Sequence, residues 1–178
     1  MADTLLVRTM PINIYEVIRQ EASSHLGNAA AIDGDREISY GELFDAVEEI
    51  ARELKSYGVE PTQRVALSCA DSIEYIVTSL AVLSLRAAVV PISPSYSRDE
   101  VDEVLKELDV SLLISDKEMS PPGDARQISA QRFFEKSLVL HPRAAREDLP
   151  EEYYALNPAF IRFSSGTTGA SKGVVLSH

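Results

Sequence analysis

The sequence predicts an α/β fold in which a mostly parallel sheet is flanked by helices. Short apolar runs, each suited to one buried strand, occur at Arg64–Ser68, Ala87–Ile92 and Val110–Ile114. Between them, Asp71–Leu85 and Ser97–Leu108 carry apolar residues at helical spacing. The order strand, helix, strand, helix, strand is typical of a parallel sheet whose strands are connected by helices lying on its faces.

The residues before this alternation predict a helix, a β-hairpin and a second helix. Ile12–Ala22 has helical spacing of apolar residues, and Ala29–Ile32 and Glu37–Tyr40 flank a turn rich in aspartate and glycine. Gly41–Tyr57 is the clearest amphipathic helix in the sequence, and Gly58 is placed to end it.

Two of the expected helices carry a capping signature at their start. Asp71 is followed three residues later by Glu74, and Ser97 is followed in the same way by Glu100. In a capping box, the first side chain accepts from the helix backbone and the glutamate reaches back to the cap residue. We therefore expect Asp71 and Ser97 to be the N-caps of their helices.

The second half of the chain is less regular. Asp116–Asp124 is polar and contains Pro-Pro-Gly, which predicts a surface loop. A short helix and a strand are expected between Ser129 and Leu140, followed by an irregular connector over His141–Asn157. Ala159–Phe163 and Val174–Leu176 are apolar and predict two further strands.

Composition indicates a single folded domain. The 178 residues are 45% hydrophobic and 25% charged, and 28 acidic against 17 basic residues give a net charge of −11. That charge disfavours nucleic acid and anionic membranes as partners. Cys69 is the single cysteine, so no intrachain disulfide forms, and we find neither a signal peptide nor an apolar stretch suited to a transmembrane segment. The simplest expectation is a cytoplasmic protein.

The segment Ser164–Gly173 carries the strongest chemical signal. Its three glycines allow backbone N–H groups to converge on an anion, while serine and threonine hydroxyls and Lys172 add further donors. It is not a Walker A loop, because Lys172 lies between Ser171 and Gly173 and a strand-like run follows. We interpret it as a phosphate-binding loop between two strands; the alternative is a flexible Ser/Thr/Gly-rich hairpin without a ligand.

Phe163–Val174, which reads FSSGTTGASKGV, closely resembles the signature loop of the AMP-forming adenylating enzymes. That superfamily includes acyl- and aryl-CoA synthetases, firefly luciferase and the adenylation domains of peptide synthetases. Ile38–Leu43 and Val89–Pro94 resemble other family segments, in family order, and the likeness runs from about residue 12 to residue 178. Two departures are Ser171, where most members have proline, and Arg86, where the family usually has glycine.

The resemblance implies that ATP activates a carboxylic acid, fatty or aryl, to an acyl-adenylate with loss of pyrophosphate. CoA then takes the acyl group as a thioester, because the loop looks most like those of CoA ligases. Mg²⁺ accompanies ATP, with Thr167 or Thr168 as a candidate ligand. The family's adenylation lysine lies downstream, so no catalytic residue is expected here. The residues expected to bind the β- and γ-phosphates are Ser164, Ser165, Gly166, Thr167, Thr168, Gly169 and Lys172.

By the same resemblance, residues 1–178 are the N-terminal portion of the large adenylating domain, ending just after the loop at 164–173. We expect this portion alone to be inactive and to self-associate through exposed apolar surface. Three alternatives stay open: a peptide-synthetase adenylation domain, a non-catalytic binding module on the same scaffold, and an unrelated phosphate-binding domain.

Other chemistry is poorly supported by the sequence. Cys69 follows a buried strand and is expected to be a core residue rather than a nucleophile. His25, His141 and His178 do not have the spacing of a zinc site. Gly169–Gly173 has the spacing Gly-x-Ser-x-Gly, but a strand-like run follows it. The nucleophile elbow of hydrolases leads into a helix, so no such elbow is present, which weighs against a hydrolase.

Overall fold

The computed structural model describes residues 12–117, 126–130, 132–144, 149, 151–164 and 172–178. Its helices are α1 (Ile14–Glu21), the 3-10 helix η1 (Ala22–Ser24), α2 (Tyr40–Ser56), α3 (Ile73–Ser84), α4 (Arg98–Glu107) and α5 (Glu151–Ala155). Its strands are β1 (Ala29–Asp33), β2 (Arg36–Ser39), β3 (Arg64–Ser68), β4 (Ala88–Pro91), β5 (Leu112–Ser115), β6 (Arg126–Ile128), β7 (Leu138–Pro142), β8 (Pro158–Ser164) and β9 (Lys172–Ser177).

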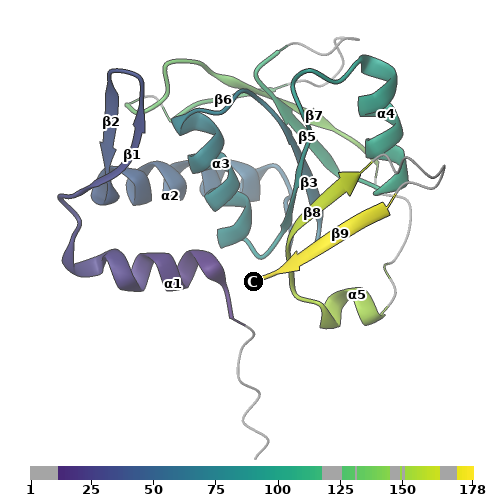
Figure 1. Ribbon diagram of the computed structural model, residues 1–178, viewed down its shortest axis with the longest axis horizontal. Coiled ribbons are helices and arrows are strands. Elements are labelled where there is room, and N and C mark those ends of the chain that lie inside the picture. Colours follow the sequence, from purple (N-terminus) through teal and green to yellow (C-terminus); the bar gives the residue numbers. More distant parts are fainter. Residues whose placement is uncertain (1–11, 118–125, 131, 145–148, 150, 165–171) are drawn as a thin grey trace, which may run out of the picture.

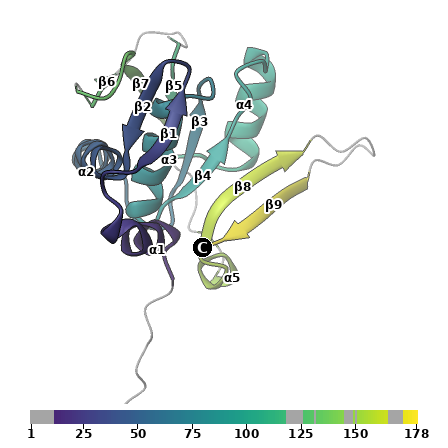
Figure 2. The ribbon, with the colours of Figure 1, turned by 60° about the vertical axis from the view of Figure 1, so that its left-hand side comes forward.

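Seven strands form one mixed sheet in the order β6-β7-β5-β3-β4-β8-β9, and β1 and β2 form a separate hairpin (Figure 1). β5, β3, β4 and β8 are mutually parallel, whereas β7 and β9 pair antiparallel to their neighbours. Helices α1, α2 and α3 pack on one face, and α4 packs on the other (Figure 2). The predicted α/β class with a mostly parallel sheet flanked by helices is confirmed.

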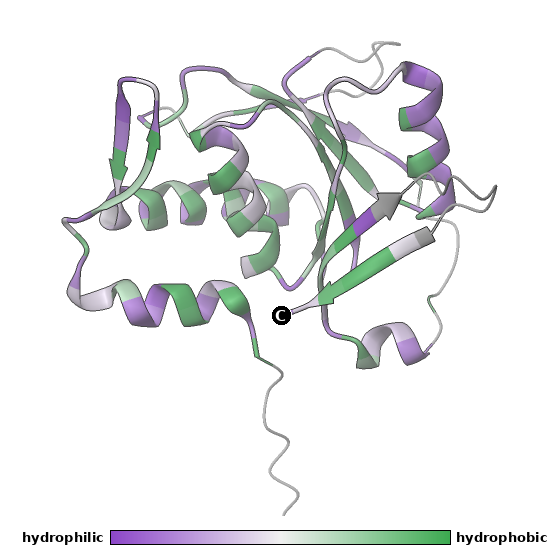
Figure 3. Cartoon of the chain, viewed as in Figure 1, coloured by the Kyte–Doolittle hydropathy of each residue, from purple (hydrophilic) through white to green (hydrophobic). Residues whose placement is uncertain are grey.

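The core lies on both faces of the central strands. In β3, Val65 and Leu67 belong to the cluster under α2 and α3, while Ala66 belongs to the cluster under α4. All three are fully buried, as expected for a strand covered on both sides. Figure 3 shows the apolar residues concentrated along these strands and on the inward sides of the helices.

The long helix α2 shows why the amphipathic pattern predicts well. Its apolar face buries Leu43, Val47, Ile50 and Leu54, and each such side chain stabilises the fold by roughly 1.5–3 kcal/mol relative to exposure. Gly58, just beyond the helix, has φ of 94°, a left-handed conformation that glycine adopts without steric cost.

The two capping predictions have different outcomes. At α4 the prediction is confirmed, because Ser97 and Glu100 form a complete capping box. At α3 the prediction is wrong: the N-cap is Ser72, whose Oγ accepts the N–H of Tyr75 at 3.2 Å. Glu74 does not reach back to the cap, because its carboxylate is held instead by a distant arginine described below.

The irregular half of the chain corrects further expectations. Between residues 129 and 138 the described residues form turns and no helix, although the expected strand is present as β7. The expected irregular connector, His141–Asn157, contains the end of β7 and the short helix α5. Most of the predicted loop Asp116–Asp124 lies outside the described residues. These elements are too short for periodicity to be recognised in the sequence.

Arg86 has φ of 60°, a left-handed conformation that glycine adopts readily and arginine does not. Its N–H donates to Leu83 O at 2.9 Å and its carbonyl accepts from Thr62 N at 2.7 Å, which fixes the turn between α3 and β4. The left-handed conformation explains physically why the family that this sequence resembles usually has glycine at the position of Arg86.

None of the helices in the described part of the chain is both long and apolar enough to cross a membrane.

Candidate functional site

The β8–β9 hairpin presents the predicted loop at one edge of the sheet. Because β8 runs parallel to β4, its last residue, Ser164, lies at the edge where the other parallel strands also end. Ligands of open α/β sheets bind outside the carboxyl ends of such strands. Figure 2 shows β8 and β9 side by side at one margin of the molecule, with α5 next to the start of β8.

The two strands pair antiparallel up to the loop itself. The last register pair is Ser164 with Lys172, so backbone pairing closes the base of the predicted loop. This confirms that the segment connects two strands and does not lead into a helix. The other predicted binding residues, and the side chains of Ser164 and Lys172, lie outside what the structure describes: Ser165, Gly166, Thr167, Thr168 and Gly169.

The hairpin is anchored in the apolar core. Ile161 of β8 and Val175 of β9 are register partners, and both pack into the apolar cluster under α4. Ala159, two residues before Ile161 in β8, belongs to the other cluster and is buried. The strands that flank the loop are therefore held by both halves of the core.

Hydrogen bonds to the N-terminal helix hold the other end of the hairpin. The N–H of His178 donates to Asn157 O at 3.1 Å, and the Asn157 amide donates to Ile12 O at 2.8 Å. His178 Nδ1 accepts the N–H of Ile14 at 3.1 Å. The start of α1 is thereby fixed to the end of the hairpin furthest from the loop.

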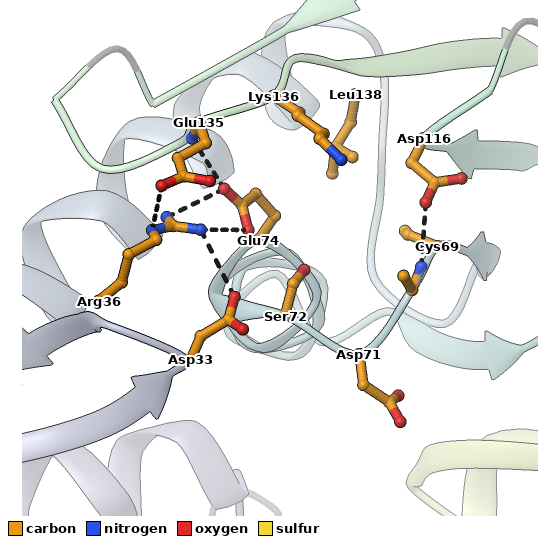
Figure 4. Close-up of a pocket in the computed structure, with 11 residues that line it drawn as sticks. Asp33, Arg36, Cys69, Asp71, Ser72, Glu74, Asp116, Glu135, Lys136 and Leu138 are labelled. Carbon is orange, nitrogen blue, oxygen red and sulfur yellow. Dashed lines mark hydrogen bonds and ion pairs between the residues drawn. The ribbon is translucent and has the colours of Figure 1, made fainter.

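A polar cavity of about 270 Å³ lies at the carboxyl ends of β3 and β5 (Figure 4). Arg36 dominates one wall: it contacts Glu74 at 3.0 Å, Glu135 at 3.3 Å and the carbonyl of Phe133 at 2.8 Å. The Glu74 carboxylate also accepts the N–H of Glu135 at 2.8 Å. Asp116, on the other wall, accepts from the N–H of Ala70 at 3.1 Å.

The charged groups that line this cavity pair with one another and stabilise the fold. Glu74 is only 5% exposed; burial opposes its charged form, but the Arg36 hydrogen bonds and backbone N–H groups outweigh burial and lower its pKa. The hydrogen bond to Glu74 in turn raises the pKa of Arg36. Because the arginine's donors are used within the protein, it is not available to bind an anion.

Cys69 lines the same cavity but lacks the environment of a nucleophile. Burial, with smaller contributions from Asp116 and Glu74, raises its pKa to about 12, so the thiol stays protonated at neutral pH. The prediction that Cys69 is a core residue is confirmed. In the described ranges, no three His, Cys, Asp or Glu side chains are grouped to hold a metal ion.

Comparison with known proteins gives the family. Residues 18–178 match the model of the AMP-binding enzyme family. The chain belongs to the AMP-binding enzyme family. This membership confirms the resemblance drawn from Phe163–Val174 and the preceding segments.

Individual members are similar over most of this chain. The nonribosomal peptide synthetase ivoA of Emericella nidulans is 30% identical over 167 residues, which is 93% of this chain and 10% of that relative. The N-terminal subdomain of Klebsiella oxytoca NpsA, in complex with 3-hydroxybenzoyl-AMSN, superposes with a TM-score of 0.71 at 23% identity, covering 95% of this chain and 42% of that one. The inhibitor-bound N-terminal domain of Mycobacterium tuberculosis FACL13 gives 0.69 at 25% identity, covering 95% and 45%.

The chain spans between 2% and 15% of the length of the first curated relatives that it matches. The likeness to NpsA shows a shared fold, and the family model shows the family.

Two contacts of the folded chain could not be predicted from the sequence. Arg36 and Glu74 lie 38 positions apart, and Ile14 and His178 lie 164 positions apart, so no local pattern links the partners.

Proposed function

We propose that this chain supplies the phosphate-binding part of an enzyme that activates a carboxylic acid with ATP. The family match over residues 18–178 carries the proposal. The position of the β8–β9 connection at the carboxyl edge of the parallel strands supports it. A carboxylate oxygen attacks the α-phosphorus of ATP, the bond to the bridging oxygen breaks, and pyrophosphate leaves with the electron pair.

In this proposal the connection between β8 and β9 binds the β- and γ-phosphates. Negative charge grows on the departing pyrophosphate, so donors fixed around it lower the barrier. The net charge of −11 makes such local donors necessary, because the overall field repels a triphosphate. The residues proposed for this role are Ser164, Ser165, Gly166, Thr167, Thr168, Gly169 and Lys172.

Mg²⁺ neutralises part of the triphosphate charge in this reaction class. Mg²⁺ usually keeps several waters and binds through one or two protein oxygens together with substrate phosphates, so we propose that the phosphates supply most of its ligands. A hydroxyl from Thr167 or Thr168 is the proposed protein ligand, consistent with the preference of Mg²⁺ for oxygen.

The acyl acceptor has two candidates. The loop residues Ser165–Gly169 resemble those of CoA ligases, which favours the thiol of CoA. Curated relatives named as peptide synthetases, such as ivoA, favour a carrier domain. The two acceptors can be distinguished by incubating the enzyme with its acyl-adenylate bound, separately with CoA and with a phosphopantetheinylated carrier domain. Only the true acceptor should form an acyl thioester.

We further propose that residues 1–178 form the N-terminal portion of the large adenylating domain. The solved neighbours are more than twice as long as the part that this chain matches. On this proposal the product of the complete reading frame catalyses acid-dependent ATP–pyrophosphate exchange, and the 178-residue chain alone does not. ATP–pyrophosphate exchange by the 178-residue chain would show that the catalytic residues lie within residues 1–178, contrary to the proposal. A stop codon directly after His178, with no exchange, would favour a non-catalytic module on this scaffold.

A further inference from the structure

His178 makes a hydrogen bond that only its neutral form can make. Its Nδ1 lies 3.1 Å from the N–H of Ile14, and a backbone N–H can only donate. Nδ1 must therefore carry a lone pair, which places the ring proton on Nε2. Nε2 is buried and has no hydrogen-bond partner among the described residues.

Two groups that disfavour a charged imidazole act on the ring, and one group opposes them. Ile14 is the first residue of α1, and the N-terminus of a helix carries partial positive charge. The guanidinium of Arg86, from the turn after α3, also acts on the ring, while Glu16 of α1 acts in the opposite direction. Glu16 is partly neutralised because its Oε1 lies 3.4 Å from Arg86.

We propose that His178 is a pH-sensitive latch that joins α1 to the β8–β9 hairpin when neutral and releases it when protonated. Protonation puts an N–H on Nδ1, directly facing the N–H of Ile14, so the hydrogen bond becomes a repulsion. The new charge also faces the start of α1 and Arg86. Because β9 runs from the predicted loop to this bond, acid loosens the end of the hairpin opposite residues 165–171. The proposal does not depend on the nucleotide-binding role.

The direction of the pH dependence follows from burial first and Arg86 second, which together lower the pKa of His178 below its ordinary value of 6.5. An unfolded chain then binds a proton at a higher pH than the folded chain does. The stability that the latch contributes is complete above pH 6.5. It is lost as the pH falls from 6.5 towards the folded-state pKa.

The direct test is an NMR titration of the three imidazole rings in the wild-type chain. We expect the His178 ring to titrate below 6.5 and, at high pH, to show the proton on Nε2. The Ile14 amide signal should titrate with it. A His178 pKa at or above 6.5, or an Ile14 amide signal that does not follow the ring, would overturn the latch. Adding Gly-Ser after His178 separates the effect of a terminal carboxylate from that of the ring.

Two variants test the consequence by hydrogen exchange. His178→Asn keeps an acceptor near the position of Nδ1 but cannot titrate, so protection of the α1 amides should become independent of pH between 7 and 5. In the wild type, protection at Ile14 should fall about tenfold for each unit by which the pKa of His178 is lowered. His25→Asn, at an exposed histidine, is the matched control and should behave as wild type. An unchanged pH response in His178→Asn contradicts the proposal.

Discussion

The two flanks of the sheet are fastened to the rest of the molecule in opposite ways. On the β6–β7 side, the connection at Phe133–Glu135 is held by charge, through the Arg36 contacts with Glu74 and Glu135. On the β8–β9 side, the hairpin is held to α1 by uncharged hydrogen bonds from Asn157 and to His178. The first fastening depends on both partners staying ionised. In the second, the bond between Ile14 and His178 depends on a neutral histidine, whereas the bond from Asn157 to Ile12 does not.

The difference indicates which flank can respond to its surroundings. Removing one member of a buried ion pair leaves an unpaired buried charge, which strongly destabilises the fold. The Arg36–Glu74 contact is therefore a fixed structural contact. The proposed His178 latch changes state as the pH falls below 6.5, without any change in sequence. The flank next to the proposed phosphate loop is thus the adjustable one.

The largest expected effect comes from breaking the charged fastening. Arg36→Ala leaves the Glu74 carboxylate, only 6% exposed, without its cation, and we expect it to lower the free energy of unfolding by about 3 kcal/mol. Arg126→Ala is the matched control: its partner Glu53 is 43% exposed, and the expected loss is below about 1 kcal/mol. Urea unfolding of both variants measures the difference, and equal losses would show that the Arg36 contact is no stronger than a surface pair.

The outer strands of the two flanks also differ as edges. β6 has three residues and begins with Arg126, whereas β9 has six and is uncharged from Gly173 to Ser177. Val174 and Leu176 are 52% and 47% exposed, and no described strand pairs with the outer edge of β9. Short, charged edges resist pairing between chains, and long apolar edges favour it.

We therefore expect the 178-residue chain to self-associate through β9. Antiparallel pairing of two copies about Val175 places each Val174 opposite Leu176 of the other copy. Val174→Lys combined with Leu176→Lys should weaken association by at least about tenfold, through lost apolar burial and added charge. Sedimentation equilibrium measures it, with Gln127→Lys on β6 as control. A wild-type chain that stays monomeric over the whole concentration range would contradict association through β9.

The smallest expected effect tests the turn beside the latch. Arg86→Gly relieves the left-handed backbone by about 1 kcal/mol, but glycine gains freedom in the unfolded chain and the half-exposed contact with Glu16 is lost. The stability should therefore change by less than about 1 kcal/mol. The pKa of His178 should rise, because Arg86 helps to lower it. An NMR titration in which this pKa stays unchanged or falls would show that Arg86 does not lower the pKa of His178.

The sequence predicted those elements whose signals are local. β3 was predicted at its exact bounds, and α2 and α4 to within one residue at either end, because burial of an amphipathic face and the Ser97–Glu100 capping box are contained within each segment. The strand–loop–strand arrangement at the candidate site was predicted from its glycines and apolar flanks.

Most of the failures share a cause, which is dependence on partners distant in the sequence. Glu74 looked like a capping residue because nothing near it reveals that Arg36 holds its carboxylate. The antiparallel placement of β7 and β9 depends on pairing with strands formed elsewhere in the chain, whereas the five-residue helix α5 is too short for its periodicity to be recognised. The role of His178 at the start of α1 could not be seen either, since the two residues meet only in the folded chain.

The central claim is that the β8–β9 connection holds the leaving phosphates of ATP. The most direct test is acid-dependent ATP–pyrophosphate exchange by the product of the complete reading frame, comparing Lys172→Ala with wild type. We expect at least a ~100-fold loss of exchange, the usual effect of removing one group that stabilises transition-state charge. Lys55→Ala, at an exposed lysine in the last turn of α2, should retain the wild-type rate. An exchange rate left intact by Lys172→Ala would contradict the claim.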